Sequence, residues 1–221
     1  DNVRCRRGDK IIDGKSFPHE KFNPDSEEIV EEGNIDDTKS VYLYSDFNDD
    51  TAGSVPSGGK ANPKNDDNKV AVAEKPDVEN KSLMISKGAD GDPYIDFSLS
   101  GFNAASAVFE VSFLSEDINS LKIITLKDSS AKFNEIIRIK DGGILSVAGK
   151  NIAEYEAGRW YKIALVMDYN NMTIDVYIDG KKTAEKLPFA NLDFDMPSAL
   201  RAQIIGSSAA ETVYLDDLGF Y

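Results

Sequence analysis

Val108-Phe109-Glu110-Val111-Ser112-Phe113 alternates apolar and polar side chains, and this alternation decides the fold. Successive side chains of a β-strand point to opposite faces of a sheet, so Phe109, Val111 and Phe113 must share one face. The two polar side chains between them point the other way. We therefore predict a half-buried strand whose aromatic and aliphatic face belongs to the core.

The same alternation recurs near the C-terminal third of the chain. Ile174, Val176 and Ile178 are predicted to face inward, which leaves Asp175 and Tyr177 on the opposite face. Turn residues separate such runs, because Gly, Asn and Asp accept the left-handed backbone that tight hairpins require. Turns of this kind are predicted at Asp141-Gly142-Gly143, Asp168 to Asn171 and Asp179-Gly180-Lys181.

Short apolar runs between turn signals continue from Val41 to the C-terminus, and no stretch has the periodicity of a long amphipathic helix. The expected strands are 41–44, 82–86, 94–99, 107–114, 121–126, 135–140, 144–147, 160–169, 172–178, 203–205 and 212–220. Residues 1–40 are polar and are expected to form an arm or linker. We predict an all-β, two-sheet antiparallel β-sandwich over residues 41–221.

Composition narrows the classes of partner. The chain has 221 residues, of which 41% are hydrophobic, enough for one sizeable β-sandwich core. Its 39 acidic and 25 basic residues give a formal net charge of -14, which argues against binding to nucleic acid or to anionic membranes. Since no apolar run approaches the roughly 18 residues of a membrane span, membrane insertion is not expected.

Few residues are suited to nucleophilic or zinc chemistry. Cys5 stands alone, so no internal disulfide is expected, and its role is left open. His19 is the single histidine, which disfavours Ser-His-Asp or Cys-His catalysis and a His-rich zinc site. The chain begins at Asp1 without a signal-peptide pattern, so we expect it to be a fragment or a mature form.

Three segments carry a family resemblance. They are the run Tyr44 to Gly58 with its Gly-x-x-Pro loop, the run Trp160 to Lys181 with the pattern W-x-x-I…D…Y-x-D-G-K, and Val213 to Leu218. In this order they resemble the opening strand, a hairpin and the closing strand of the concanavalin A-like, laminin-G-like jelly-roll modules attached to bacterial polysaccharide lyases and glycoside hydrolases. The resemblance covers about residues 41–221. One departure is Gly59, where such modules commonly carry Trp.

The resemblance implies a non-catalytic carbohydrate-binding module, extracellular or at the cell surface. The module would bind a polysaccharide, and catalytic or surface-anchor domains would be attached to the module in the same protein. Sugar binding uses aromatic rings that stack on sugar faces and planar polar groups that satisfy hydroxyls. The candidates are Arg138, Tyr177, Arg201 and Gln203 on faces opposite the core, with Tyr155 in a loop. An Arg can also pair with a uronate carboxylate.

The resemblance also implies a structural calcium ion. In such modules the first and last strands lie together and hold Ca²⁺ near their ends, and the surplus of Asp supplies the oxygen ligands that this ion prefers. The candidate ligands are Asp46, Asn48, Asp49 and Asp216. The alternative interpretation is that these residues only cap turns.

Two other functions stay open. A polysaccharide hydrolase needs paired carboxylates, and no Glu-x-Asp-x-x-Glu pattern is present. A lyase needs a base with Arg or Gln neighbours, which Arg138 with Tyr177 would imitate. Besides such an enzyme, the second open function is a structural or adhesive cell-surface module that binds protein, which predicts an exposed apolar patch and no response to sugar.

Overall fold

The computed structural model describes residues 40–118, 121–140, 142–206 and 210–221. The predicted N-terminal arm, residues 1–40, and Cys5 within it lie outside the described residues, except for Ser40. Within the described ranges, no helix has the length and hydropathy needed to cross a membrane. The first strand begins at Leu43 and the last ends at Phe220, within the segment predicted to form the sandwich.

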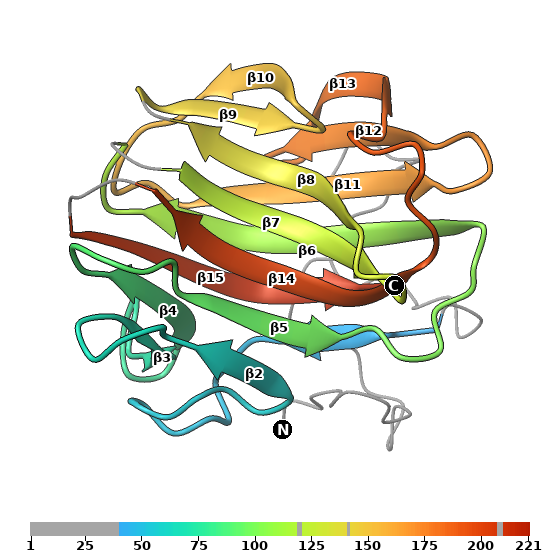
Figure 1. Cartoon of the computed structure of the whole chain (residues 1–221). Coiled ribbons are helices and arrows are strands. Elements are labelled where there is room, and N and C mark those ends of the chain that lie inside the picture. Colours follow the sequence, from blue (N-terminus) through green and yellow to red (C-terminus); the bar gives the residue numbers. More distant parts are fainter. Residues whose placement is uncertain (1–39, 119–120, 141, 207–209) are drawn as a thin grey trace.

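The described strands form two antiparallel sheets that pack face to face, as predicted (Figure 1). The first sheet has the order β13 (Lys181–Pro188), β12 (Thr173–Ile178), β11 (Tyr161–Asp168), β6 (Ser106–Ser115), β15 (Glu211–Phe220), β4 (Ser82–Lys87) and β3 (Lys69–Ala73), and β1 (Leu43–Ser45) also pairs with β15. The second sheet has the order β10 (Lys150–Glu154), β9 (Ile144–Val147), β8 (Phe133–Lys140), β7 (Leu121–Asp128), β14 (Pro197–Ile205), β5 (Tyr94–Ser98) and β2 (Gly59–Asn62). In Figure 1 the second sheet lies in front of the first.

The core lies between the two sheets, and its composition confirms the predicted alternation. Phe109, Val111 and Phe113 of β6 all belong to the buried cluster, as do the three inward-facing residues of β12. The second sheet contributes alternate residues such as Ile124 and Leu126 of β7. Because truncating a buried Phe removes both transfer energy and packing, each central phenylalanine contributes about 3–5 kcal/mol to stability.

The terminal strands of the sandwich lie side by side. Leu43 of β1 faces Phe220 of β15, and Ser45 faces Leu218, in an antiparallel pair. This arrangement agrees with the expectation that the first and last strands meet. It brings the loop after β1 close to the middle of β15, where Asp216 lies.

The sequence did not reveal four strands, and all four lie at the ends of the sheets. β13 and β3 end the first sheet, and β10 and β2 end the second. An edge strand has one unpaired side and is often protected by charged residues, so it need not carry an apolar alternation. β13, with the sequence KKTAEKLP, is exposed along most of its length, which explains why its pattern did not predict a strand.

Glycine is required where the backbone turns or approaches a neighbour closely. Gly143 has a φ of 73°, and a Cβ there would lie 2.5 Å from the carbonyl oxygen of Tyr155. Gly59, the position of the missing Trp, begins β2, and a Cβ there would lie 2.5 Å from Ile95 Cδ1. A larger residue at position 59 would therefore require Ile95 to move.

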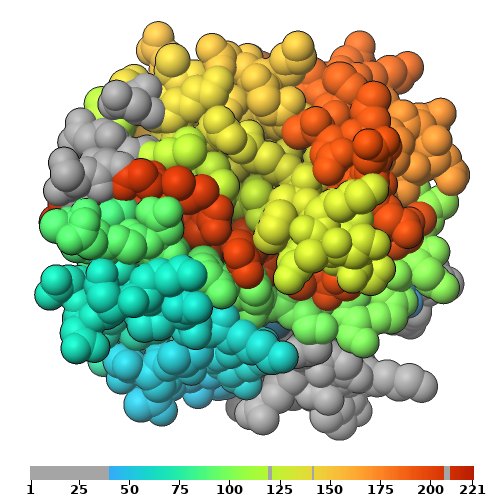
Figure 2. Space-filling view, viewed as in Figure 1, coloured from blue at the N-terminus to red at the C-terminus, as the bar shows by residue number. Residues whose placement is uncertain are grey.

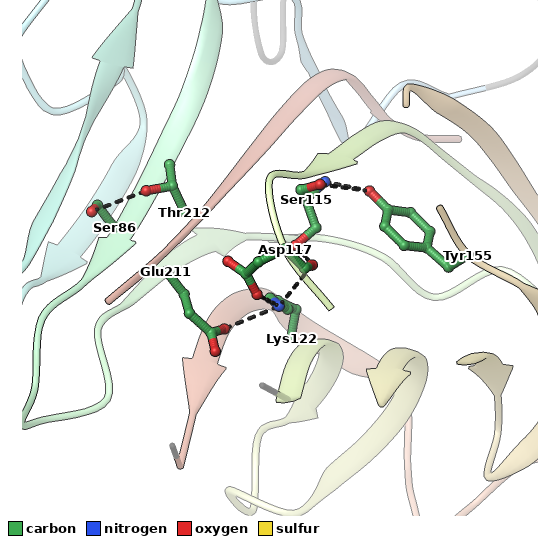
Figure 3. A network of polar contacts seen from close by, with 7 residues as sticks. All are labelled: Ser86, Ser115, Asp117, Lys122, Tyr155, Glu211 and Thr212. Carbon is green, nitrogen blue, oxygen red and sulfur yellow. Dashed lines mark hydrogen bonds and ion pairs between the residues drawn. The ribbon is translucent and has the colours of Figure 1, made fainter. Parts of the chain in front are cut away.

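A buried ionic cluster joins the two sheets at one end of the sandwich (Figure 3). Lys122 Nζ of β7 lies 2.6 Å from Asp117 Oδ1 and 3.0 Å from Glu211 Oε2 of β15. The side chains of Lys122 and Glu211 are 1% and 0% exposed. Since a buried charge is costly without a partner, these groups depend on one another.

Candidate functional site

The outer face of the second sheet contains a hollow of about 350 Å³. Its lining consists of outward-facing residues of three adjacent strands and part of the β13–β14 loop, namely Ile123, Thr125, Phe133, Glu135, Ala190, Asn191, Arg201 and Gln203. This volume falls at the lower end of the range for ligand sites in proteins. Figure 2 looks onto this face.

Strand register brings the polar residues of the hollow into one row. Arg201 of β14 faces Asp96 of β5 on one side and Thr125 of β7 on the other. Thr125 in turn faces Glu135 of β8. The neighbours of Arg201 along β14, Leu200 and Ala202, are buried in the core, so the row points away from the core. Segments far apart in sequence thus build a continuous polar floor.

A β-bulge places two charged residues of β8 on this face. The register between β7 and β8 shifts between Ile124 and Thr125, so that Ile136 and Ile137 are both buried. An extra residue in one strand lets side chains three positions apart share a face. Glu135 and Arg138 consequently form an ion pair on the outer surface.

Arg201 is held firmly at the centre of the face. Its Nε and Nη2 atoms each donate a hydrogen bond of 2.7 Å to the carboxylate of Asp96. Its Cζ lies 3.8 Å from the ring centroid of Tyr94 and 5.2 Å from that of Phe133. The hydrogen bonds that Arg201 donates to Asp96 raise the pKa of Arg201. The guanidinium is therefore charged and fixed in orientation.

Phe133 forms an exposed aromatic wall of the hollow. Its side chain is 41% exposed at the start of β8. The adjacent β13–β14 loop is tied to the same strand, because Asn191 Nδ2 donates to the Phe133 carbonyl at 3.1 Å and its backbone N–H donates to Asn134 Oδ1 at 3.1 Å. A partly exposed aromatic ring with neighbouring amides suits stacking against a sugar ring.

Asp128 holds together the two loops that frame this wall. Its Oδ1 accepts the backbone N–H groups of Ser130 and Lys132, and its Oδ2 accepts that of Asp195. Burial favours the neutral carboxyl, but the hydrogen bonds from Lys132, Asp195 and Ser130 outweigh it and lower the pKa of Asp128. The ionised form of Asp128 thus fixes the position of the loops.

Three of the five predicted carbohydrate-binding residues lie on this face. Arg201 and Gln203 line the hollow. Arg138 lies beside it, opposite Ile123 in the register, and holds Glu135. These three residues were expected on faces opposite the core, and the structure brings them together on one face, with Arg201 in a strand that begins earlier than predicted.

Tyr155 and Tyr177 lie elsewhere. Tyr155 lies in a loop, as predicted, but it is a core residue: it is buried, its ring lies 4.7 Å from that of Tyr161, and its hydroxyl accepts a hydrogen bond from the Ser115 backbone. The loop folds inward because this ring completes the aromatic core. Tyr177 faces away from the core as predicted, but on the first sheet, where it is buried beneath Lys182. Neither tyrosine lines the hollow.

Two of the predicted calcium ligands come close to each other. Asp46 and Asp216 are both buried. Burial, with smaller contributions from the charges of Asp217 and Asp46, raises the pKa of Asp216 to about 8. The loop after β1 and the middle of β15 therefore form an acidic pair that a hard cation would stabilise.

The other two predicted ligands do not complete the set. Asn48 Oδ1 accepts the Lys81 backbone N–H at 2.6 Å, and Lys81 Nζ donates to the carbonyls of Asn48 and Asp50. Asp49 is exposed on the same loop. Among the described residues, no group of three His, Cys, Asp or Glu side chains is arranged to hold a metal ion. The four residues do not fit a common coordination shell, and calcium binding stays a prediction for Asp46 and Asp216.

Several residues of the hollow were not expected from the sequence. Phe133 and Glu135 alternate with buried residues, but the strand was predicted to begin only at Glu135. Thr125 is buried, and its hydroxyl has no hydrogen-bond partner within the described part of the chain. Asn191 lies in a loop whose sequence has no alternation of apolar and polar residues. The alternation before Ile136 was the one signal that pointed to Phe133.

Comparisons with known proteins identify the fold. No protein-family model matches the chain, and no curated protein sequence matches it. A solved sialidase superposes with a TM-score of 0.67 and 12% identity over 82% of this chain, which spans 18% of the sialidase chain. A structure from a study of endo-acting O-glycanases of the human gut microbiota superposes with a TM-score of 0.57 and 11% identity. The match covers 82% of this chain and 98% of that chain. The carbohydrate recognition domain of Emp47p superposes with a TM-score of 0.51 and 11% identity over 81% of this chain and 94% of that chain.

These likenesses define the class of fold. The chain forms a concanavalin A-like jelly-roll β-sandwich, as the resemblance of its three motif segments had implied. At such low identities the comparisons define the architecture and leave the ligand to be inferred from the site.

Proposed function

We propose that this chain is a non-catalytic carbohydrate-binding module that holds a polysaccharide in the hollow on the second sheet. The observation that carries the proposal is the combination of an exposed Phe133 ring with planar polar groups at Arg201, Gln203 and Asn191. Sugars present an apolar ring face and a rim of hydroxyls, and this arrangement matches both.

The arrangement of carboxylates supports a binding role over hydrolysis. Glu135 lines the hollow, and Asp96 lies at the other end of the same row. Arg201 and Thr125 lie between them in this row. In glycosidases that use two carboxylates, these groups flank the bond that is cleaved, with the substrate between them. Moreover, each of these two carboxylates is engaged by an arginine of the chain.

The setting of the module is part of the proposal. The fold occurs as a small part of a solved sialidase and as a carbohydrate recognition domain in Emp47p. By analogy, we propose that this chain acts outside the cell or at its surface, joined to domains that degrade or anchor polysaccharide.

A panel of neutral and acidic polysaccharides tests the proposed function. Calorimetry and affinity electrophoresis should detect weak, saturable binding, and Gln203→Ala should reduce it without changing the melting temperature. Thr183→Ala, on the exposed strand β13 of the first sheet, is the matched control and should bind like the wild type. Failure to bind any member of the panel would reject the proposal and favour a protein-binding adhesive module.

A further inference from the structure

Both arginines on the outer face of the second sheet are already paired with carboxylates of the chain. Arg201 donates two 2.7 Å hydrogen bonds to Asp96 in a bidentate arrangement, and Arg138 pairs with Glu135. The Asp96–Arg201 pair is largely shielded, with side-chain exposures of 23% and 16%. A guanidinium joined to a carboxylate in this way presents little net charge to a ligand.

This pairing decides what Arg201 can offer. A guanidinium has five N–H donors, and two of them are committed to Asp96. The guanidinium lies over the rings of Tyr94 and Phe133, which restrict its movement. The remaining N–H groups suit single hydrogen bonds to neutral hydroxyls. A ligand carboxylate would have to displace Asp96 to obtain the bidentate contact that makes arginine an anion receptor.

The rest of the lining offers little attraction to an anion. Glu135 contributes a carboxylate, while Asn191 and Gln203 contribute neutral amide groups. Three lysines lie around the lining: Lys127 Nζ is 5.9 Å from the Phe133 ring, Lys64 Nζ is 4.9 Å from the Tyr94 ring, and Lys60 of β2 faces Asp96 in the register. Salt screens the fields of these outlying ammonium groups. The net charge of -14 repels polyanions at longer range.

On the basis of the proposed function, we propose that the hollow selects neutral sugar units and discriminates against uronates and sulfated sugars, and that Asp96 and Glu135 set this preference. The two carboxylates act as positioning residues. They hold the arginines as oriented donors to hydroxyls and cancel the charge that would otherwise attract an acidic glycan.

Matched polysaccharides that differ only in charge test this inference. The probes are methyl-esterified and de-esterified homogalacturonan, xylan with and without glucuronate, and galactan with and without sulfate, each titrated at physiological salt. The neutral member of a bound pair should bind at least about tenfold more tightly, which equals about 1.4 kcal/mol. Equal or tighter binding of the charged member overturns the inference while supporting the proposed function. If none of the probes binds, both the proposed function and the inferred preference for neutral sugars are rejected.

Two substitutions test the role of the carboxylates. Asp96→Asn and Glu135→Gln each keep the size of the side chain but leave an arginine without its counter-charge. Each should reduce the preference for the neutral member, and the melting temperature reports whether the variant is folded. Asp175→Asn breaks the corresponding Asp175–Lys182 pair on the first sheet and should leave the preference unchanged. An unchanged preference in both folded variants contradicts the assigned role. If either fails to fold, the wild-type comparison alone decides.

Discussion

Asp96 of β5 and Arg201 of β14 face each other across neighbouring strands, and their side chains form two parallel hydrogen bonds of 2.7 Å. The two residues are 105 positions apart in the sequence. This pair fixes the guanidinium at the floor of the hollow beside the Phe133 ring. The orientation of the polar floor is thus built into the sheet before any ligand arrives, which lowers the entropic cost of binding.

Replacement of the aromatic wall should weaken binding selectively. Phe133→Ala removes an exposed ring, so we expect a loss of about 1 kcal/mol, or roughly fivefold in affinity, with little change in stability. Calorimetry with whichever polysaccharide the wild type binds measures the effect. Val78→Ala removes another exposed apolar side chain and serves as the control. An equal loss in both variants would show that the wall has no specific role.

The buried cluster in Figure 3 should be sensitive to removal of its cation. Lys122→Met leaves the buried Glu211 carboxylate without its counter-charge, so we expect a loss of about 3–5 kcal/mol in the free energy of unfolding. Urea unfolding measures it. The double variant Lys122→Met with Glu211→Leu should recover much of this loss, because it removes both buried charges.

An exposed ion pair provides the contrast. Lys182→Met breaks the pair with Asp175, whose side chains are 44% and 29% exposed, and should change stability little. If Lys122→Met behaves like Lys182→Met, the ionic cluster does not join the sheets energetically.

Acid should loosen the loops around the hollow through Asp128. The pKa of this carboxyl is lower in the folded protein than its ordinary value of 3.8. Its ionised form therefore stabilises the folded state above that ordinary value, and the contribution is lost as the pH falls through the lower, folded pKa. We expect Asp128→Asn to have a lower melting temperature near neutral pH and a flatter decline between about pH 5 and about pH 2.

The comparison for Asp128 lies in the same loop region. Asp193→Asn changes an exposed carboxylate and should preserve the wild-type pH profile. Parallel profiles for the wild type and Asp128→Asn would contradict the assigned role of the Asp128 hydrogen bonds.

Calcium should stabilise the protein if Asp46 and Asp216 hold it. A ligand that binds only the folded state raises stability by mass action, by about 2.7 kcal/mol at a hundredfold excess over its dissociation constant. We expect calcium to raise the melting temperature and a chelator to lower it, as differential scanning fluorimetry would record. Asp216→Asn should abolish the response, whereas Asp66→Asn, in the exposed β2–β3 loop, should retain it. No response in the wild type would exclude calcium as a structural ion here.

The sequence predicted most strands but missed those at the sheet edges. A central strand such as β6 must bury every second side chain, so its composition reveals it. An edge strand such as β13 is stabilised by hydrogen bonds to one neighbour and keeps a polar composition. The pairing of an edge strand depends on residues elsewhere in the chain, and the residues of the strand itself do not predict it.

The candidate site was predictable only in part. Strand alternation placed Arg201 and Gln203 on an outer face, and the hollow contains both. Tyr155 lies in a loop, as predicted, but its burial was not foreseen, because a loop residue without a repeating pattern gives no sign of its burial. Arg138 shares a face with Glu135 only through a bulge, which arises from pairing with β7.

By itself, the sequence determined which side chains of regular strands such as β6 and β12 face the core, because the two-residue repeat of a strand is a local property of the backbone. Only the tertiary structure decided which strands became neighbours. It placed Asp96 against Arg201, Thr125 against Glu135, and the β13–β14 loop over Phe133. These relations depend on hydrogen bonds and packing between distant segments, which no local pattern encodes, and the candidate site consists of such relations.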